Sequence, residues 1–201
     1  MRDAGARSRE AYNKLAHDYD NSREGRFTRA FKDMICAHIS LKSSDRVLDV
    51  ACGPGTLLSE LGGMKPITGY GVDIADEMIK VAARRYPALT FRVAGCESMP
   101  FDDGMMDVIT VCAAYHHFPN PDLFAKEAER LLRPGGLLYI ADVRWPAFLR
   151  VVANPFMPLL KSGDVKIYSP KEIVNTFTKR QFTSAAVRVS GHIQLIVLRR
   201  I

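Results

Sequence analysis

Residues 47–56, VLDVACGPGT, pass abruptly from a short apolar run to a glycine-rich turn. Gly53 and Gly55 allow backbone conformations, and a close approach to a neighbour, that a Cβ atom would block. In an open parallel sheet, ligands bind beyond the carboxyl ends of the strands, and the first strand–turn–helix unit is a favoured place. The stretch therefore predicts a buried strand that ends at a ligand-binding turn.

Outward from this turn, short apolar runs alternate with amphipathic segments. The expected strands are 46–50, 67–73, 89–94, 106–112, 137–142, 183–189 and 193–198. Helical patterns cover 56–61, 75–86 and 122–132, and we expect Pro134-Gly135-Gly136 to terminate the last of these. This alternation predicts a Rossmann-like, doubly wound, mostly parallel seven-stranded sheet with helices on both faces. The hairpin-sized gap at Ser190-Gly191 predicts an antiparallel C-terminal edge hairpin.

The chain of 201 residues is long enough for a single domain with one sizeable core. Helical patterns before the first strand break at Asp20-Asn21-Ser22 and at Gly25. A Pro-rich apolar stretch after the fifth strand has two open interpretations, a packed surface helix or a lid over a ligand site. The expected segments are an N-terminal helical cover (1–42), a cofactor-binding core (43–142), the apolar insertion (143–169) and a C-terminal helix and strand pair (170–201).

Composition narrows the class of protein. The net charge of +6 is scattered, whereas a nucleic-acid footprint is normally clustered. No two of the four cysteines are separated by two residues, so neither a zinc knuckle nor a thioredoxin-like pair is indicated. The first residues lack the apolar core of a signal peptide, and the longest apolar stretch, 147–160, is too broken to cross a bilayer. We expect a reduced cytoplasmic protein with no membrane span and no nucleic-acid partner.

A second signal concerns the ligand itself. Asp73, at the end of the next expected strand, is well placed to accept hydrogen bonds from both hydroxyls of a ribose. A dinucleotide fingerprint would require a third glycine where Leu58 stands, and the loop lacks the Gly-Lys-Ser/Thr of a phosphate-binding P-loop. A cofactor with a ribose but no phosphates fits better, and S-adenosylmethionine is such a cofactor.

From about residue 46 to 142, roughly half the chain, the sequence resembles class I S-adenosylmethionine-dependent methyltransferases. It is most similar to the type 11 group, which includes the ubiquinone/menaquinone-biosynthesis methyltransferases. The ordered matches are VLDVACGPGT (47–56), GVDIADEMI (71–79), ESMPFDDGMMDVI (97–109) and AERLLRPGGLLYIAD (128–142). Several matches in family-like order are far more specific than a single glycine-rich turn.

The resemblance implies roles for the matching positions. Asp49 would orient the methionyl ammonium through water, Asp73 would bind the ribose, and the backbone of Cys96 would meet the adenine edge. Gly53 and Gly55 would line the methionyl side, and Ile74 and Met78 would flank the adenine. The full cofactor-binding set is Asp49, Ala51, Gly53, Gly55, Asp73, Ile74, Met78, Gly95, Cys96, Glu97 and Cys112.

The chain departs from the family pattern at two positions. Ala51 replaces the family's first glycine, a change that we expect to be harmless. Gly95 stands where the family often has an Asp that bonds the adenine amino group.

Two histidines after the fourth strand are the candidate catalytic residues. His116 or His117 could act as a general base. Alternatively, one caps the strand end and the other packs against the cofactor or a helix. We expect no metal site here, because the spacing suggests no third ligand. Tyr12 and Tyr19 could belong either to a cover over the cofactor or to the core.

The sequence thus predicts a methyltransferase acting by in-line transfer on a small, partly hydrophobic molecule. Nucleic-acid amine methylation usually comes with an Asn/Asp-Pro-Pro-aromatic motif after the fourth strand, where residues 112–115 read CAAY. The main alternative is a non-catalytic binding or regulatory module of methyltransferase-like fold, and a nicotinamide-dependent reductase is a second rival. Nothing in the sequence indicates the oligomeric state.

Overall fold

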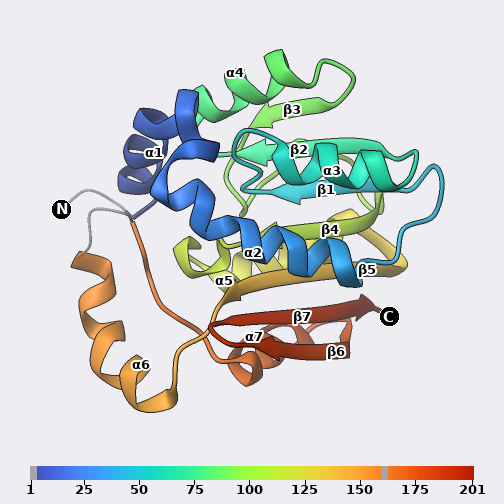
Figure 1. The fold of residues 1–201 in the computed structure, drawn as a ribbon. Helices are drawn as coiled ribbons and strands as arrows, with labels where there is room; N and C mark the ends of the chain where they lie inside the picture. Colours follow the sequence, from blue (N-terminus) through green and yellow to red (C-terminus); the bar gives the residue numbers. More distant parts are fainter. Residues whose placement is uncertain (1–3, 160–162) are drawn as a thin grey trace.

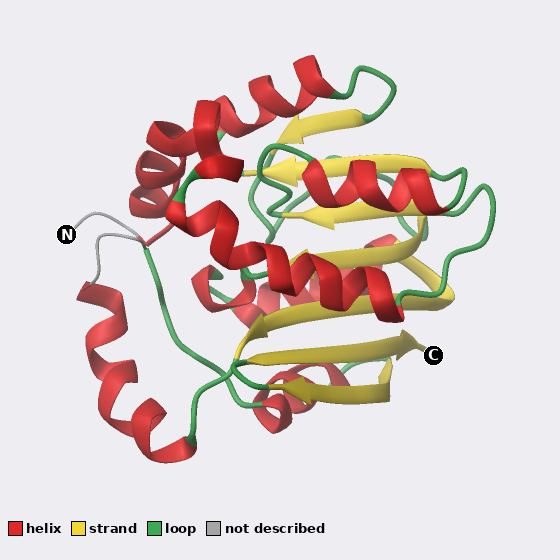
Figure 2. Ribbon diagram, viewed as in Figure 1, coloured by secondary structure: helices red, strands yellow, loops and turns green. Residues whose placement is uncertain are grey.

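The computed structural model describes residues 4–159 and 163–201, and its centre is one seven-stranded sheet (Figures 1 and 2). The strands are β1 (Arg46–Val50), β2 (Thr68–Asp73), β3 (Thr90–Val93), β4 (Met106–Cys112), β5 (Leu132–Val143), β6 (Phe182–Ser190) and β7 (Ile193–Arg200). They lie in the order β3-β2-β1-β4-β5-β7-β6. The first five strands run parallel, and β7 is antiparallel to both of its neighbours. The expected fold class is confirmed.

Helices cover both faces of the sheet. They are α1 (Ala4–Leu15), α2 (Arg23–His38), α3 (Thr56–Met64), α4 (Asp76–Arg85), α5 (Pro121–Leu131), α6 (Ala147–Ala153) and α7 (Pro170–Thr178), with short 3₁₀ turns η1 (Ala16–Asn21), η2 (Tyr115–His117) and η3 (Asn154–Leu159). One buried cluster joins apolar side chains of α2, α3 and α4 to the sheet, and another joins α5 and α7 to it. The alternation of strands and helices in the sequence produces these layers because each amphipathic helix buries its apolar stripe on the sheet.

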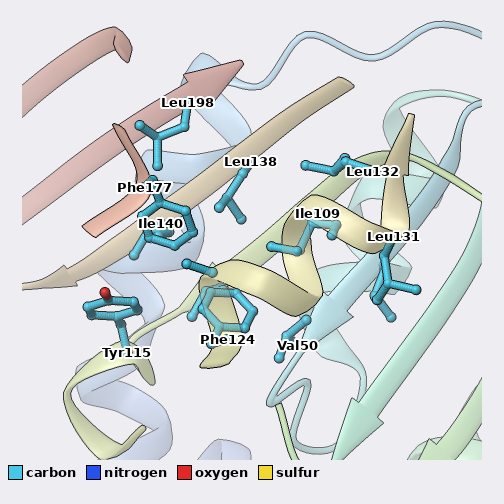
Figure 3. Packing of buried hydrophobic residues seen from close by; sticks show 14 of the residues in the cluster. Val50, Ile109, Tyr115, Phe124, Leu131, Leu132, Leu138, Ile140, Phe177 and Leu198 are labelled. Carbon is cyan, nitrogen blue, oxygen red and sulfur yellow. The ribbon is translucent and has the colours of Figure 1, made fainter. Parts of the chain in front are cut away.

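Aromatic rings fill the layer between α5, α7 and the sheet (Figure 3). Phe124 of α5 and Phe177 of α7 are both fully buried, with ring centroids 5.9 Å apart in an edge-to-face arrangement. Tyr115 of η2 is also fully buried and packs against Phe124, Phe177 and Tyr168. This rigid layer holds the segment that follows β4, which carries His116 and His117, against the body of the protein.

The position of the ligand site follows from the strand order. β1 pairs with β2 on one side and with β4 on the other, both in parallel. The connections leaving β1 and β4 therefore start at the same edge of the sheet and diverge, which leaves a crevice between them.

The fifth strand differs from expectation. It begins at Leu132, directly after α5, and Pro134-Gly135-Gly136 lies inside it instead of terminating the helix from outside. The pairing with β4 shifts register between Met106 and Val108, so this part of the strand is irregular. Gly135 has a φ of 79°, a left-handed conformation that glycine adopts without strain.

Gly25 was also expected to break the N-terminal helices, but it lies in the first turn of α2. The break falls at residues 16–22, where the side chain of Ser22 caps α2 by accepting a hydrogen bond from the Gly25 N–H at 3.0 Å. A Cβ atom at position 25 would lie 1.9 Å from the main-chain oxygen of Tyr19. Glycine is therefore needed here for close packing of η1 on α2, not for a break.

The described part of the apolar insertion, 143–159 and 163–169, buries Met157 and Ile167 in the core, whereas α6 contributes no buried residue and none of these residues lines the cavity described below. In α6, Phe148, Val151 and Val152 are 70%, 76% and 67% exposed, and Phe156 of η3 is 61% exposed. In Figure 1, α6 stands away from the sheet. None of the helices within residues 4–159 and 163–201 combines the length and the apolar composition that a membrane span requires.

The packing at Gly25 leads to a paired test of stability. Gly25→Ala should lower the free energy of unfolding by about 1–3 kcal/mol, because the methyl group must displace the main chain of η1. Gly62→Ala, inside α3 with open space around its Cβ position, should raise it by about 0.5–1 kcal/mol. Urea denaturation of both variants measures the difference, and a neutral Gly25→Ala would show that η1 does not pack this closely on α2.

Candidate active site

A cavity of about 210 Å³ opens at the carboxyl ends of β1, β2, β3 and β4. Most of the predicted site residues line it: Ala51, Gly53, Asp73, Ile74, Met78, Gly95, Cys96, Glu97, Cys112 and His117. Asp49, Gly55 and His116 do not line it. The roles assigned to these residues remain predictions, but the structure brings most of them together at the expected crevice.

Asp73 joins the two loops that begin the cavity. Its Oδ2 accepts the N–H of Gly53 at 2.9 Å, and its Oδ1 accepts the N–H of Ala75 at 2.8 Å. Burial raises the pKa of Asp73, although these two hydrogen bonds oppose the rise. Each carboxylate oxygen has a further lone pair, so the side chain can still accept hydrogen bonds from a ligand in the cavity.

The glycine-rich turn contains one strained residue. Ala51 has a φ of 58°, in the left-handed region that a residue with a Cβ atom adopts at a cost of about 1–2 kcal/mol. Ala113, at the end of the neighbouring β4, has a φ of 50°. The replacement of glycine by Ala51 therefore strains the backbone, and both strained alanines lie in the cavity wall.

Gly55 serves packing. It has a φ of 82°, and a Cβ atom there would lie 2.8 Å from the Phe91 ring and 3.2 Å from the Tyr86 ring. Glycine at this position lets α3 begin close to β3, behind the cavity wall.

Asp49 lies beneath the turn, beside a second and much smaller cavity that Lys32 and Thr28 also line. Thr110 donates a hydrogen bond to its Oδ1 at 2.7 Å, and the residue is 2% exposed. Burial raises the pKa of Asp49 to about 7, while Thr110 and Lys32 oppose the rise. A buried carboxylate with so little compensation is suited to hold a cation nearby.

The wall formed by residues 94–97 and Cys112 combines one carboxylate, Glu97, with two thiols. Burial raises the pKa of the Cys96 thiol to about 12 and that of Cys112 well above its usual range, so both thiols stay protonated. A Cβ atom at Gly95 would meet nothing within 4 Å, and its φ is not in the left-handed region. The space in front of Gly95 is therefore open to a larger side chain or to a ligand.

The N-terminal segment closes the cavity. Gly5, Ser8 and Tyr12 of α1 and Tyr19 of η1 line it. Sequence reasoning weighed the two tyrosines for a cover but missed Gly5 and Ser8, for which no motif gave a signal.

Two side chains of α1 bind the start of α4. Asn13 donates to Asp76 at 3.0 Å and accepts from the Glu77 N–H at 3.0 Å, and Arg9 donates to the same Asp76 carboxylate at 2.9 Å. The cover is thereby fixed against the helix that carries Met78.

The two histidines occupy different environments. His116 Nδ1 lies 2.6 Å from Oδ1 of Asp142, which is 1% exposed, and His117 Nε2 lies 3.0 Å from the Tyr12 hydroxyl. Burial lowers the pKa of His116, but the Asp142 carboxylate outweighs this effect and raises it. Burial and the neighbouring His116 lower the pKa of His117.

The structure also places Asp164 beside this pair. Its Oδ1 lies 3.5 Å from His116 Nε2 and 3.2 Å from His117 Nδ1. Asp164 belongs to the stretch after α6, so spacing along the sequence could not identify it as a neighbour of residues 116 and 117. Spacing suggested no third ligand, and the structure brings one potential ligand to the histidines from a distant stretch; the absence of a metal site stays a prediction.

The charge of the side chains that line the cavity favours one kind of ligand over another. Asp73 and Glu97 line the cavity, and among the residues that the structure describes no Lys or Arg does so. A pyrophosphate would find no cationic side chain there, whereas a nucleoside that carries a cationic group would be favoured. The fold and the site define a Rossmann-like protein whose acidic cavity suits a nucleoside cofactor that carries a positive charge.

Comparison with known proteins narrows this class. Residues 48–140 match the family model of the type 11 methyltransferase domain, so this core is a methyltransferase domain and the resemblance seen in the sequence is confirmed. The chain is 34% identical over 140 residues to a demethylmenaquinone methyltransferase of Chlorobaculum parvum, an alignment covering 68% of this chain and 54% of the relative. The chain spans about half the length of the curated relatives it matches.

Solved structures share the fold over the whole chain. The putative methyltransferase of Haloferax volcanii, solved in complex with the Trm112 methyltransferase activator, aligns with a TM-score of 0.83 and 21% identity over 100% of this chain and 99% of its own. Geranyl diphosphate C-methyltransferase of Streptomyces coelicolor, solved with Mg²⁺, geranyl diphosphate and S-adenosyl-L-homocysteine, aligns with a TM-score of 0.77 and 13% identity over 100% of both chains. At these identities the likeness concerns the fold alone.

The buried Asp49 predicts an unusual pH dependence of stability. Its native pKa of about 7 exceeds the unfolded value of about 3.9, so between these pH values the native state binds more protons and stability falls as pH rises. Asp49→Asn keeps an acceptor for Thr110 and removes this penalty. At pH 8 the free energy of unfolding should rise by up to about 4 kcal/mol, with little change at pH 3.5.

Asp107→Asn provides a control of opposite sign. Burial works to raise the pKa of Asp107, but hydrogen bonds from Arg133 and from the main chain of Arg46 hold it below its usual range. This variant should therefore lose stability near neutral pH. Denaturation of the three proteins at several pH values measures both effects, and an Asp49→Asn curve parallel to wild type would contradict the assignment.

Proposed function

We propose that this chain binds S-adenosylmethionine and transfers its methyl group to a small, partly hydrophobic molecule. The observation that carries the proposal is the acidic cavity at the divergence of β1 and β4, in which Asp73 is held between the Gly53 and Ala75 amides. Ligands of doubly wound sheets bind at this crevice. The methyltransferase-domain match over residues 48–140 supports the same assignment.

The residues present fit this cofactor. Asp73 would accept the ribose hydroxyls, Ile74 and Met78 would flank the adenine, and Glu97 adds negative charge to the same wall. Asp49, beneath the Ala51–Gly53 turn, would attract the methionyl ammonium from the adjoining cavity. Fold relatives such as the Streptomyces coelicolor enzyme, solved with S-adenosyl-L-homocysteine, support this choice.

When bound, S-adenosylmethionine supplies a methyl group already activated on a sulfonium. The protein then has to hold the acceptor in line with this group and exclude water. Tyr12 and Ser8 of the cover, with Phe118 and Pro119 after η2, line the same cavity, and we assign the contact with the acceptor to these four residues. Their mixed apolar and hydroxyl character favours a small molecule with an apolar body.

The names of relatives agree with such an acceptor. The relative from Chlorobaculum parvum is a demethylmenaquinone methyltransferase, and another from Mycobacterium ulcerans acts, by its name, on phthiotriol/phenolphthiotriol dimycocerosates. We propose an acceptor of this general kind, a small molecule and not a nucleic acid.

Gly95 keeps a second candidate open, a non-catalytic module that binds the cofactor or a related nucleoside. Gly95 stands where the family often has an Asp that bonds the adenine amino group, and the space beside it is open. This chain therefore lacks that carboxylate. Turnover across a panel of phenolic, quinol and amine acceptors distinguishes the two functions, because a module would bind without methylating any of them.

Cofactor binding is tested first at Asp73. Calorimetric titration of the wild type with S-adenosylhomocysteine should show one site per chain. Asp73→Asn should weaken binding by about 10- to 100-fold, since a hydrogen bond to a charged group contributes about 1.5–3 kcal/mol. Asp33→Asn, whose carboxylate pairs with Arg29 on the surface, should bind as wild type does. A wild type that responds to neither S-adenosylmethionine nor S-adenosylhomocysteine would rule out the proposed cofactor.

A substitution at Gly95 is expected to increase the affinity for the cofactor. Gly95→Asp should fold normally, because a Cβ atom there meets nothing, and should tighten S-adenosylhomocysteine binding several-fold by pairing with the adenine amino group. Gly95→Ala is the matched control and should leave affinity nearly unchanged. If the Asp variant binds more weakly than the Ala variant, the adenine lies elsewhere in the cavity.

A further inference from the structure

Three potential metal-binding atoms converge where η2 meets the stretch that follows α6. One nitrogen each of His116 and His117 and one oxygen of Asp164 all lie within 4.8 Å of one another. The two distances to Asp164 Oδ1 are 3.5 and 3.2 Å. Ligand atoms about 2.0–2.1 Å from a tetrahedral zinc ion lie about 3.3 Å apart. We propose that these three side chains bind a divalent transition-metal ion, with zinc as the reference ion.

The unpartnered nitrogen of His117 points to a ligand independently. Nδ1 is buried and has no hydrogen-bond partner, although a carboxylate oxygen lies 3.2 Å away. The opposite nitrogen, Nε2, is engaged by the Tyr12 hydroxyl at 3.0 Å. If Nε2 carries the proton, the Nδ1 lone pair faces a carboxylate, an unfavourable contact unless a cation lies between them.

The outer contacts of His116 match those of metal-ligating histidines. Such a histidine usually donates its second ring N–H to a carboxylate, which fixes the tautomer and the ring orientation. His116 Nδ1 lies 2.6 Å from Asp142 Oδ1, which also accepts the Val143 N–H at 2.8 Å. Nε2 of His116 is thereby left to face Asp164 with its lone pair.

The main chain fixes Asp164 next to the histidines. The N–H groups of Val165 and Lys166 both donate to the main-chain oxygen of His116, at 2.9 and 3.2 Å. Gly163 has a φ of 80° and packs so closely on α1 that a Cβ atom would lie 2.8 Å from the Ser8 nitrogen. The three ligands are therefore positioned by the fold and need little rearrangement to bind an ion.

The balance of charge also favours a cation. Two carboxylates, Asp142 and Asp164, accompany the two imidazoles, and the four side chains are between 1% and 18% exposed. Sparsely solvated carboxylates need a cationic partner. A divalent ion bound between the two imidazoles and Asp164 would add positive charge close to both carboxylates.

The site adjoins the cofactor cavity, because His117 also lines that cavity. Three protein ligands leave a coordination position for a water or a substrate atom, as in catalytic zinc sites. The ion would therefore bind an oxygen of the acceptor, such as a hydroxyl or an enol. This last step rests on the proposed function, whereas metal binding itself does not.

The test is zinc binding by the full-length chain after treatment with a chelator. Calorimetry and elemental analysis should show one zinc per chain. Asp164→Asn and His117→Gln should each weaken binding at least about 10-fold. His38→Gln, an exposed histidine that contacts the Met34 carbonyl, and Asp103→Asn, an exposed carboxylate, are matched controls and should bind zinc as wild type does.

Wild-type protein provides a second readout with cobalt(II). A tetrahedral visible spectrum without a thiolate charge-transfer band is expected, because the site contains no cysteine. Absence of stoichiometric binding, a thiolate band, or unchanged affinity in both ligand variants would overturn the proposal. Titration of the same samples with S-adenosylhomocysteine tests the two proposals separately. Zinc binding without nucleoside binding refutes only the proposed cofactor. Nucleoside binding without zinc binding refutes only the metal site.

Discussion

The hydrogen bond from the Gly53 main chain to the Asp73 carboxylate is the contact on which the site depends. It joins the turn after β1 to the end of β2, and the second oxygen of Asp73 holds the turn that starts α4 at Ala75. One buried carboxylate thus fixes two loops whose N–H groups would otherwise lack partners in a crevice. This side chain thereby fixes the two loops that form the Asp73 side of the cavity.

A buried acid of this kind is costly, and the structure places several at the same edge of the sheet. Asp49, Asp73 and Asp142 each lie among the last two residues of their strands, β1, β2 and β5, and all are nearly inaccessible to solvent. Two alanines, Ala51 and Ala113, add backbone strain there. Burial of the apolar layers on both faces of the sheet offsets the cost of these buried carboxylates and of the backbone strain. The hydrophobic core thus stabilises the protein enough to keep an unfavourable arrangement of charges at the site.

Sequence reasoning located the sheet and the cavity because local patterns determine them. Strand and helix periodicity gave the strand positions, and the turn with Asp73 gave the crevice. Contacts between distant segments carry no such pattern: Asp164 beside His117, or Ser8 of α1 in the cavity wall, follows from tertiary packing. Glycine was the most misleading signal, since Gly25 serves close packing in the first turn of α2 and Gly136 lies inside β5, where the pairing with β4 is irregular.

The attachment of the N-terminal cover has a consequence for exchange with solvent. α1 meets α4 through polar contacts of Arg9 and Asn13 and through a small cluster around Met78, separate from the two large clusters of the sheet. Tyr12 at His117 and Ser8 at Gly163 add two further contacts, so we expect α1 to open as a unit at a free energy below that of global unfolding. Residence time in the cavity would then depend on the opening of one helix, which Asp76 holds without lining the cavity.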